Sequence, residues 1–258
     1  MEKVNVLNTN GELTNHIINT LLDSALKFYA GYEDIVMETL KKVSFYELNK
    51  KESMDTVITI LTGYCVKEGT NKGNSGVFLY PRNPMIDSEY GDTIIYRIDE
   101  AKQAYHTLAH ELFGHAVCGR EARLVKKNNE LYNRNGISLK GIYSNEKYNV
   151  YLNEGAMDFI ADSIVRNIGM RIKKSNGYAA AKMSCASIYN YIGRDNFLDA
   201  LVLNNYSLES YLDNSVGDGF FKKLSELNDI RFNSEDKGHY LTSYVYKKKI
   251  QKELKKIA

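Results

Sequence analysis

Three of the five histidines in this 258-residue chain lie close together around a single glutamate. They are His106, His110 and His115, with Glu111 between them, in the stretch AKQAYHTLAHELFGHAVC. His110 and His115 are five residues apart, which places them roughly 140° apart around a regular α-helix. Two imidazoles at that angle do not easily share one ion. This spacing therefore constrains the local fold more than any other feature of the chain.

A π-turn resolves the spacing. Its i→i+5 hydrogen bonds hold one extra residue and bring positions five apart onto one face of the helix. Gly114 stands directly before the second histidine and, because it lacks a Cβ, eases such a distortion. We therefore expect the helix over residues 101–118 to contain a π-bulge between His110 and His115.

A second acidic motif, YLNEGAMDFIAD, follows at residues 151–162. Glu154 and Asp158 are four residues apart and so share one face of a helix. A catalytic zinc site needs three protein ligands and an open position, and Glu154 can join His110 and His115 as the third. Asp158 can accept the other N–H of a ligating histidine and thereby hold its tautomer.

His106 offers a rival ligand set. His106 and His110 are four residues apart, the regular helical spacing, so a set of His106, His110 and Glu154 needs no bulge. Glu111 would then follow the second histidine, and neither H-E-x-x-H nor H-x-x-E-H would be satisfied. The favoured interpretation places His106 one turn before the ligands, where it supports one of them or lines the cleft.

The two motifs together resemble a known group. HELFGH followed by NEGAMD resembles the gluzincin zinc metallopeptidases, and the H-E-x-x-G-H form is similar to that of dipeptidyl-peptidase III. The resemblance covers these two segments only, and dipeptidyl-peptidase III enzymes are far larger, so it carries the site and not the substrate. No G-x-M-E-N signature precedes the helix, which weighs against an aminopeptidase.

The resemblance implies a zinc-dependent peptidase that acts on a peptide or protein substrate. His110, His115 and Glu154 would hold Zn²⁺, and Glu111 would act as general base toward the attacking water. A His₂Glu set also suits Fe, Co or Mn. Gluzincins often steady the oxyanion with a downstream His or Tyr; the candidates are His239, its neighbour Tyr240, and Tyr143, Tyr148 and Tyr151.

The expected fold class is α+β, mostly α-helical, and the resemblance implies a zincin-like fold in a single domain over residues 1–258. We expect N-terminal helices over 1–54, a small, mostly antiparallel sheet over 55–100, and the active-site helix and a C-terminal helical part over 101–258. Within the last part, the polar residues 119–150 are expected to form a short helix and a loop, Ala179–Ile192 an apolar helix, and Arg194–Asn204 another helix.

Three segments rich in β-branched residues are the expected strands: Thr56–Val66, Ser75–Tyr80 and Asp92–Ile98. In zinc peptidases of this general kind, an edge strand beside the active-site helix binds the substrate backbone. By resemblance, Asp92–Ile98 is the candidate for that strand. An interior core strand is the alternative.

Composition excludes several classes. A net charge of +2 argues against a nucleic-acid binder driven by bulk charge. Three widely separated cysteines suggest neither a disulfide scaffold nor a cysteine zinc site. No apolar run approaches the ~18 residues of a membrane span, and no apolar leader opens the chain. A cytoplasmic location is the default expectation, with a removed signal peptide or a leaderless export route left open.

Two other kinds of protein stay open. One is a non-catalytic zincin-like binding protein, against which the intact Glu111 counts, because a purely structural metal site has no use for that carboxylate. The other is a secreted effector or toxin protease with one specific protein target.

Overall fold

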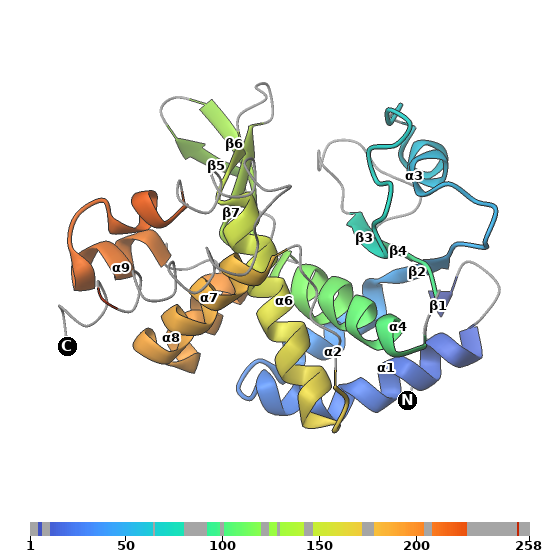
Figure 1. Cartoon of the computed structure of the whole chain (residues 1–258), viewed down its shortest axis with the longest axis horizontal. Helices are drawn as coiled ribbons and strands as arrows, with labels where there is room; N and C mark the ends of the chain where they lie inside the picture. The colour runs from blue at the N-terminus through green and yellow to red at the C-terminus, as the bar shows by residue number, and fades with distance from the viewer. Residues whose placement is uncertain are drawn as a thin grey trace. The chain divides into compact units, whose positions relative to one another are not determined.

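The structure is a computed structural model of the chain. It describes residues 5–6, 11–63, 65–79, 92–98, 101–119, 124–127, 130–141, 147–171, 178–203, 208–225 and 252. These residues are mostly helical and include two small sheets, as expected of an α+β protein (Figure 1). The chain divides into two compact units, Met1–Val117 with Ile160–Ile172, and Cys118–Phe159 with Lys173–Ala258. The single-domain expectation stays a prediction.

The helices of the first unit surround the histidine motif. α1 (Gly11–Phe28) and α2 (Glu33–Lys42) confirm the expected helices of the N-terminal region. α4 (Ala101–Leu108) continues directly into the π-helix η1 (Ala109–Ala116), and the two are drawn as one rod beside α1 in Figure 1. The buried face of α1 recurs at helical spacing and packs against α4 and η1; it consists of Thr14, Ile17, Ile18, Leu21, Leu22, Ser24, Ala25 and Phe28.

The first sheet has the order β1-β2-β4-β3. Its strands are β1 (Asn5–Val6), β2 (Ser44–Glu47), β3 (Gly76–Leu79) and β4 (Thr93–Tyr96). β1 pairs with β2 and β2 with β4 in parallel, and only β3 runs antiparallel to β4. The expectation of a mostly antiparallel sheet before the active-site helix is therefore wrong. The physical reason is that β1 and β2, from the region expected to be wholly helical, are joined by a helical crossover, which parallel pairing requires.

The position of β4 corrects a second expectation. β4, within the segment Asp92–Ile98, lies between β2 and β3 and is therefore interior, not the edge strand. Its four residues are all buried. Among the described strands, β3 forms the edge on the side next to β4, and β3 also contacts η1.

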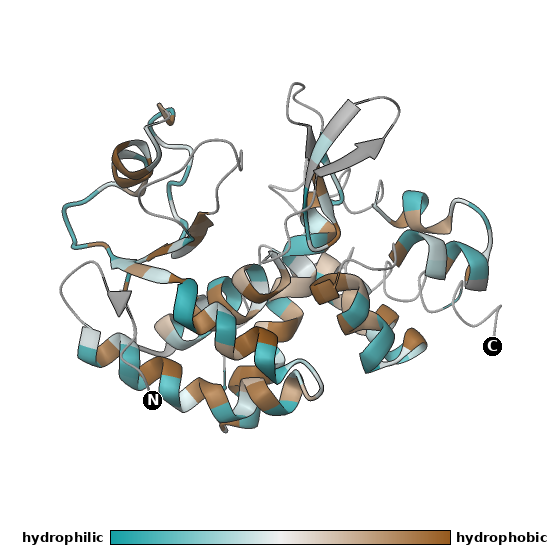
Figure 2. Ribbon diagram, turned by 180° about the vertical axis from the view of Figure 1, so that it is seen from behind, coloured by the Kyte–Doolittle hydropathy of each residue, from teal (hydrophilic) through white to brown (hydrophobic). Residues whose placement is uncertain are grey.

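The segment Thr56–Val66 is not a strand. Its residues up to Thr62 belong instead to the helix α3 (Met54–Thr62). Gly63, in the left-handed conformation with φ +68°, ends this helix. Its apolar residues also fit a helical period: Met54, Val57 and Ile58 pack with Leu48 and Ile95 against one face of the sheet. Tertiary packing thus overrides the β-propensity of its branched residues. In Figure 2, α3 and β3 are mostly brown, the colour of hydrophobic residues.

The second unit carries a sheet that the sequence pattern missed. β5 (Leu124–Lys127), β6 (Glu130–Asn135), β7 (Ser138–Gly141) and β8 (Lys147–Tyr148) pair antiparallel in chain order. The prediction of a short helix and a loop over 119–150 is therefore wrong. The only part of the short α5 (Val117–Gly119) that reaches into this range is its last residue. An antiparallel sheet can leave one face to water, so polar strands show no continuous apolar run.

The remaining helices follow that sheet. They are α6 (Val150–Asn167), α7 (Ala179–Ile192), α8 (Arg194–Leu198), the π-helix η2 (Asp199–Leu203) and α9 (Leu208–Val216). The expected apolar helix at 179–192 is confirmed, and so is the helical segment that begins at Arg194. α6 supplies its first ten residues to the second unit and its last eight, from Ile160 on, to the first.

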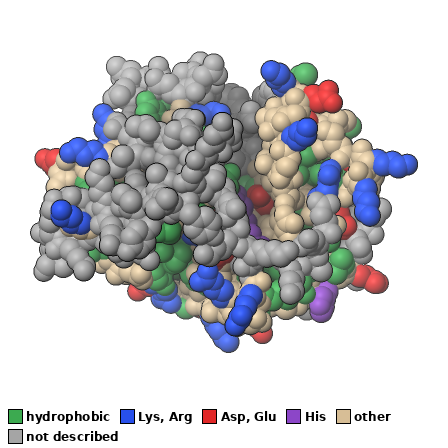
Figure 3. All heavy atoms as spheres, viewed as in Figure 1, with side chains coloured by type: hydrophobic (Ala, Val, Ile, Leu, Met, Phe, Trp, Pro, Cys, Tyr) green, Lys and Arg blue, Asp and Glu red, His purple; other side chains and the backbone are tan. Residues whose placement is uncertain are grey.

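The cysteines agree with the expectation of no disulfide scaffold. All three cysteines are free thiols; Cys118 and Cys185 are buried, and Cys65 is exposed. Within the described part of the chain, no helix is both long and apolar enough to cross a membrane. On the face shown in Figure 3, the coloured Lys and Arg side chains are scattered among other residue types.

Candidate metal centre

The π-helix η1 brings the two expected histidine ligands together. The predicted bulge is confirmed, because residues Ala109–Ala116 form a π-helix. The ring centroids of His110 and His115 lie 5.0 Å apart, closer than the 6.2 Å between His106 and His110. A regular α-helix would instead turn His115 well away from His110.

A buried tyrosine supports this distorted turn. The Tyr29 hydroxyl, at the end of α1, donates a hydrogen bond to the backbone carbonyl of Phe113. Both side chains are completely buried. A buried carbonyl needs a partner, and Tyr29 supplies one inside the segment where the helical ladder changes its register. Nothing in the sequence pattern singles out Tyr29 for this role.

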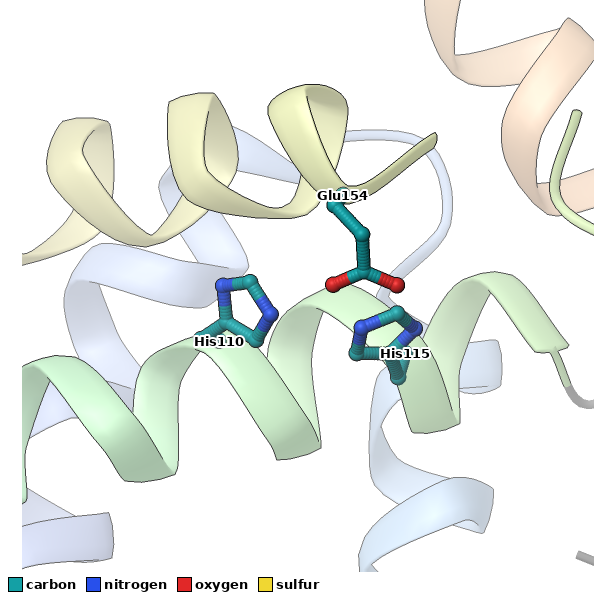
Figure 4. A group of neighbouring side chains, drawn as sticks. All are labelled: His110, His115 and Glu154. Atoms are coloured by element: carbon teal, nitrogen blue, oxygen red, sulfur yellow. The ribbon is translucent and has the colours of Figure 1, made fainter. Parts of the chain in front are cut away.

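Glu154 completes the group. It lies on α6, and its carboxylate points toward both imidazoles in Figure 4. One ligand atom from each of His110, His115 and Glu154 can be chosen so that all three lie within 4.8 Å of one another. His110 is buried, while His115 and Glu154 are partly exposed. The two motifs singled out by their spacing therefore meet as expected.

The donor set fits a divalent metal ion. Two imidazole nitrogens and one carboxylate oxygen are the ligands of several catalytic zinc sites. Zinc bonds of about 2.0–2.2 Å require ligand atoms about 3.4 Å apart in a tetrahedral site. The ligand atoms lie within 4.8 Å of one another, so binding of an ion would require them to move closer by up to about 1.4 Å. Partial exposure of His115 and Glu154 leaves a side of the group from which water or substrate can approach.

Glu111 also lies on η1, directly after His110. Its side chain is only 6% exposed. Gly76 of strand β3 lies against it, close enough that an added Cβ would be 2.9 Å from Glu111 Cγ. The expected general base is thus buried between its own helix and the edge strand of the first sheet.

His106 is held by an acid that the sequence analysis missed. Its Nε2 lies 3.3 Å from Oδ1 of Asp162, and both side chains are nearly buried. Arg166 contacts the other oxygen of Asp162 at 3.3 Å. Among the described residues, His106 does not belong to the group that could hold a metal. The four-residue spacing of Glu154, Asp158 and Asp162 along α6 was the available signal for this third acid.

Asp158 is 2% exposed, and one of its oxygens lies 3.8 Å from Nζ of Lys182 on α7. Its expected hydrogen bond to a ligating histidine stays a prediction. The oxyanion candidates His239, Tyr240 and Tyr143 lie outside the described residues. Tyr148 packs its ring edge-on against Tyr132 in the second sheet, with centroids 5.7 Å apart, and Tyr151 is half-buried on α6.

Comparison with protein-family models, with curated proteins and with solved structures finds no match to this chain.

Proposed function

We propose that this chain is a zinc-dependent peptidase with a zincin-like site, in which His110, His115 and Glu154 are the metal ligands. The observation that carries the proposal is the π-helix. It places two histidines five residues apart on one side, and Glu154 lies within ligand distance of both. A distortion of this kind is frequent at functional sites, and the same helix carries the buried Glu111.

The chemistry divides between the metal and the protein. A zinc ion held by this set would lower the pKa of a bound water and would polarise the scissile carbonyl. The Glu111 carboxylate takes a proton from the attacking water at one of its oxygens and later delivers it to the leaving amine nitrogen. The near-complete burial of Glu111 keeps bulk water from competing for that proton.

The substrate class follows from the edge strand. Ser75 directly precedes β3 and Arg97 directly follows β4. The Arg97 N–H donates to the Ser75 carbonyl at 2.9 Å, so these two residues form a hydrogen-bonded pair at the end of the β3–β4 ladder. Such pairs alternate along an antiparallel ladder. The N–H and C=O of Gly76, the next residue, therefore point away from β4. A peptide substrate that adds as a strand would pair there. The proposal thus gives β3 the role first expected for Asp92–Ile98.

Glu111→Gln tests the proposal. The amide keeps the size of the side chain but cannot accept the proton, so we expect unchanged zinc content and a loss of peptide hydrolysis of about 10²–10⁴-fold. Zinc is measured by elemental mass spectrometry and hydrolysis with a mixed peptide library. An unchanged rate contradicts the role of Glu111. Stoichiometric zinc in a wild-type protein that cleaves neither peptides nor folded proteins would favour the binding-protein alternative.

A further inference from the structure

Strand β3 passes η1 at a glycine. A Cβ built on Gly76 would lie 2.6 Å from Thr107 Cγ2, 2.9 Å from Glu111 Cγ and 3.1 Å from Glu111 Oε1. The first two distances are shorter than real Cβ contacts. Gly76 is absent from the residues with positive φ, so its backbone conformation is open to any residue. Space, and not conformational freedom, is therefore what requires glycine here.

Two of the three crowded atoms belong to one side chain. A glutamate has three rotatable bonds, and ordering such a side chain costs entropy that its surroundings must offset. The backbone of Gly76 closes one side of the space around Glu111, and burial to 6% exposure shows that other groups close most of the rest. The hydrogen bond of the preceding residue, Ser75, to Arg97 and the pairing of the rest of β3 with β4 hold this backbone in the sheet, so it cannot move freely.

We propose that Gly76 is a positioning residue for Glu111. Because Gly76 has no side chain, the Glu111 carboxylate can occupy the one position from which it reaches the attacking water. The inference rests on the proposed function, and it adds a residue outside both sequence motifs. Any side chain at position 76 would displace the carboxylate while leaving the three metal ligands untouched.

The atom nearest to the added Cβ belongs to Thr107. A loss of stability through the Thr107 contact must therefore be distinguished from a displacement of Glu111. Thr107→Ser removes the Cγ2 methyl and with it the shortest contact. Three variants are compared with the wild type in their zinc-loaded form: Gly76→Ala, Thr107→Ser and the double variant. Relief of the Thr107 contact should restore part of the melting temperature in the double variant, while the contact with Glu111 remains.

We expect kcat to fall about 10–100-fold in both Gly76→Ala and the double variant, as for a displacement of roughly 1 Å at a reacting group. KM and zinc content should stay near the wild-type values. Gly119→Ala is the matched control. Its Cβ would meet the Asn135 side chain at 2.7 Å, and its φ is likewise not positive. This variant should lose stability but keep kcat. Recovery of the full kcat in the double variant would overturn the proposal.

Crystal structures of the wild type and the double variant give a readout that does not depend on activity. A displaced Glu111 carboxylate beside unmoved metal ligands supports the proposal, and a carboxylate in its wild-type position overturns it. Failure of the wild type to cleave any substrate would count against the proposed function alone, because the crystallographic comparison still decides the role of Gly76.

Discussion

At the scale of single residues, the ligand set depends on which histidine joins His110. His115 is five residues on and His106 four residues back, and the sequence alone left both open. The structure groups His110 with His115 and Glu154. It gives His106 a different partner, Asp162. Removal of His106 and removal of His115 should therefore affect metal binding differently.

We expect His115→Ala to lose the bound metal and His106→Ala to keep it. Removal of His115 leaves two protein ligands, too few for a catalytic zinc site, whereas removal of His106 deletes a partner of Asp162 and no ligand. Elemental mass spectrometry of the purified variants measures metal per chain and also identifies the metal. Zinc kept in His115→Ala but lost in His106→Ala would establish the rival ligand set.

Residues that act through others were the hardest to predict from the sequence. His110, Glu111 and His115 stand in one motif and Glu154 in another, and the spacing within each motif is the local geometry of a single helix. Tyr29 and Gly76 act on the same helix from positions far away in the chain. No periodicity reports such contacts, because each depends on how two distant elements pack.

At the scale of elements, η1 is a π-helix, which holds one residue more than a regular α-helix between His110 and His115. We expect deletion of Gly114 to return it to a regular α-helix with an H-E-x-x-H spacing, with both histidines still on one face and one zinc retained. Insertion of an alanine after Phe113 should abolish zinc binding, because a spacing of six again places the histidines on different faces of an α-helix, roughly 120° apart.

Zinc content by elemental mass spectrometry, with helix content by circular dichroism, measures both outcomes. The insertion serves as the control, because it changes the helix length by the same amount in the opposite direction. A folded deletion variant without zinc would contradict the interpretation of η1 as a bulge that compensates for the spacing.

The helix α3 carries a second element-scale prediction. Asp55 accepts hydrogen bonds from the Gly69 N–H at 2.7 Å, the Asn71 N–H at 3.0 Å and the Asn71 side chain at 2.7 Å. Burial alone would raise the pKa of Asp55, but these hydrogen bonds outweigh it and lower that pKa below its usual value. The carboxylate thereby ties the loop that follows α3 to the first turn of the helix.

Asp55→Asn should lower the melting temperature near pH 7, and the difference from the wild type should disappear in acid. Because the folded-state pKa is the lower one, the stabilisation is complete above the unfolded-state pKa of about 3.9 and is lost as pH falls through the folded-state value. Thermal melts from pH 7 to pH 2 measure this. Glu68→Gln, at an exposed position of the same loop, is the control. A difference that persists at pH 2 would refute the role of the charge.

At the scale of the whole molecule, the ligands come from two segments of the chain, since Glu154 follows His115 by 39 residues. A metal that binds only the folded protein stabilises it by about 2.7 kcal/mol at a free concentration of one hundred times Kd. We expect chelation to lower the melting temperature by about 5–11 °C for a protein of this size.

Differential scanning calorimetry with and without a chelator measures the shift. Glu154→Ala is the matched variant, because it removes one ligand from an otherwise intact chain. Its melting temperature should respond much less to the chelator. An equal shift in the two proteins would place the metal elsewhere.

The sequence by itself determined the features that depend on neighbours along the chain. These are the helices α1 and α2 of the N-terminal region, the helix at 179–192, the π-bulge between His110 and His115, and the shared face of Glu154 and Asp158. Each follows from the rise and turn of a helix, which are the same in every protein.

Only the tertiary structure decided what depends on contacts between distant residues. It made α3 a helix despite its branched residues, placed β4 inside the sheet and β3 at its edge, and formed the second sheet from polar strands. It also paired His106 with Asp162 and set Gly76 against Glu111. These outcomes depend on which surfaces bury each other, and packing energy between separate elements leaves no period in the sequence.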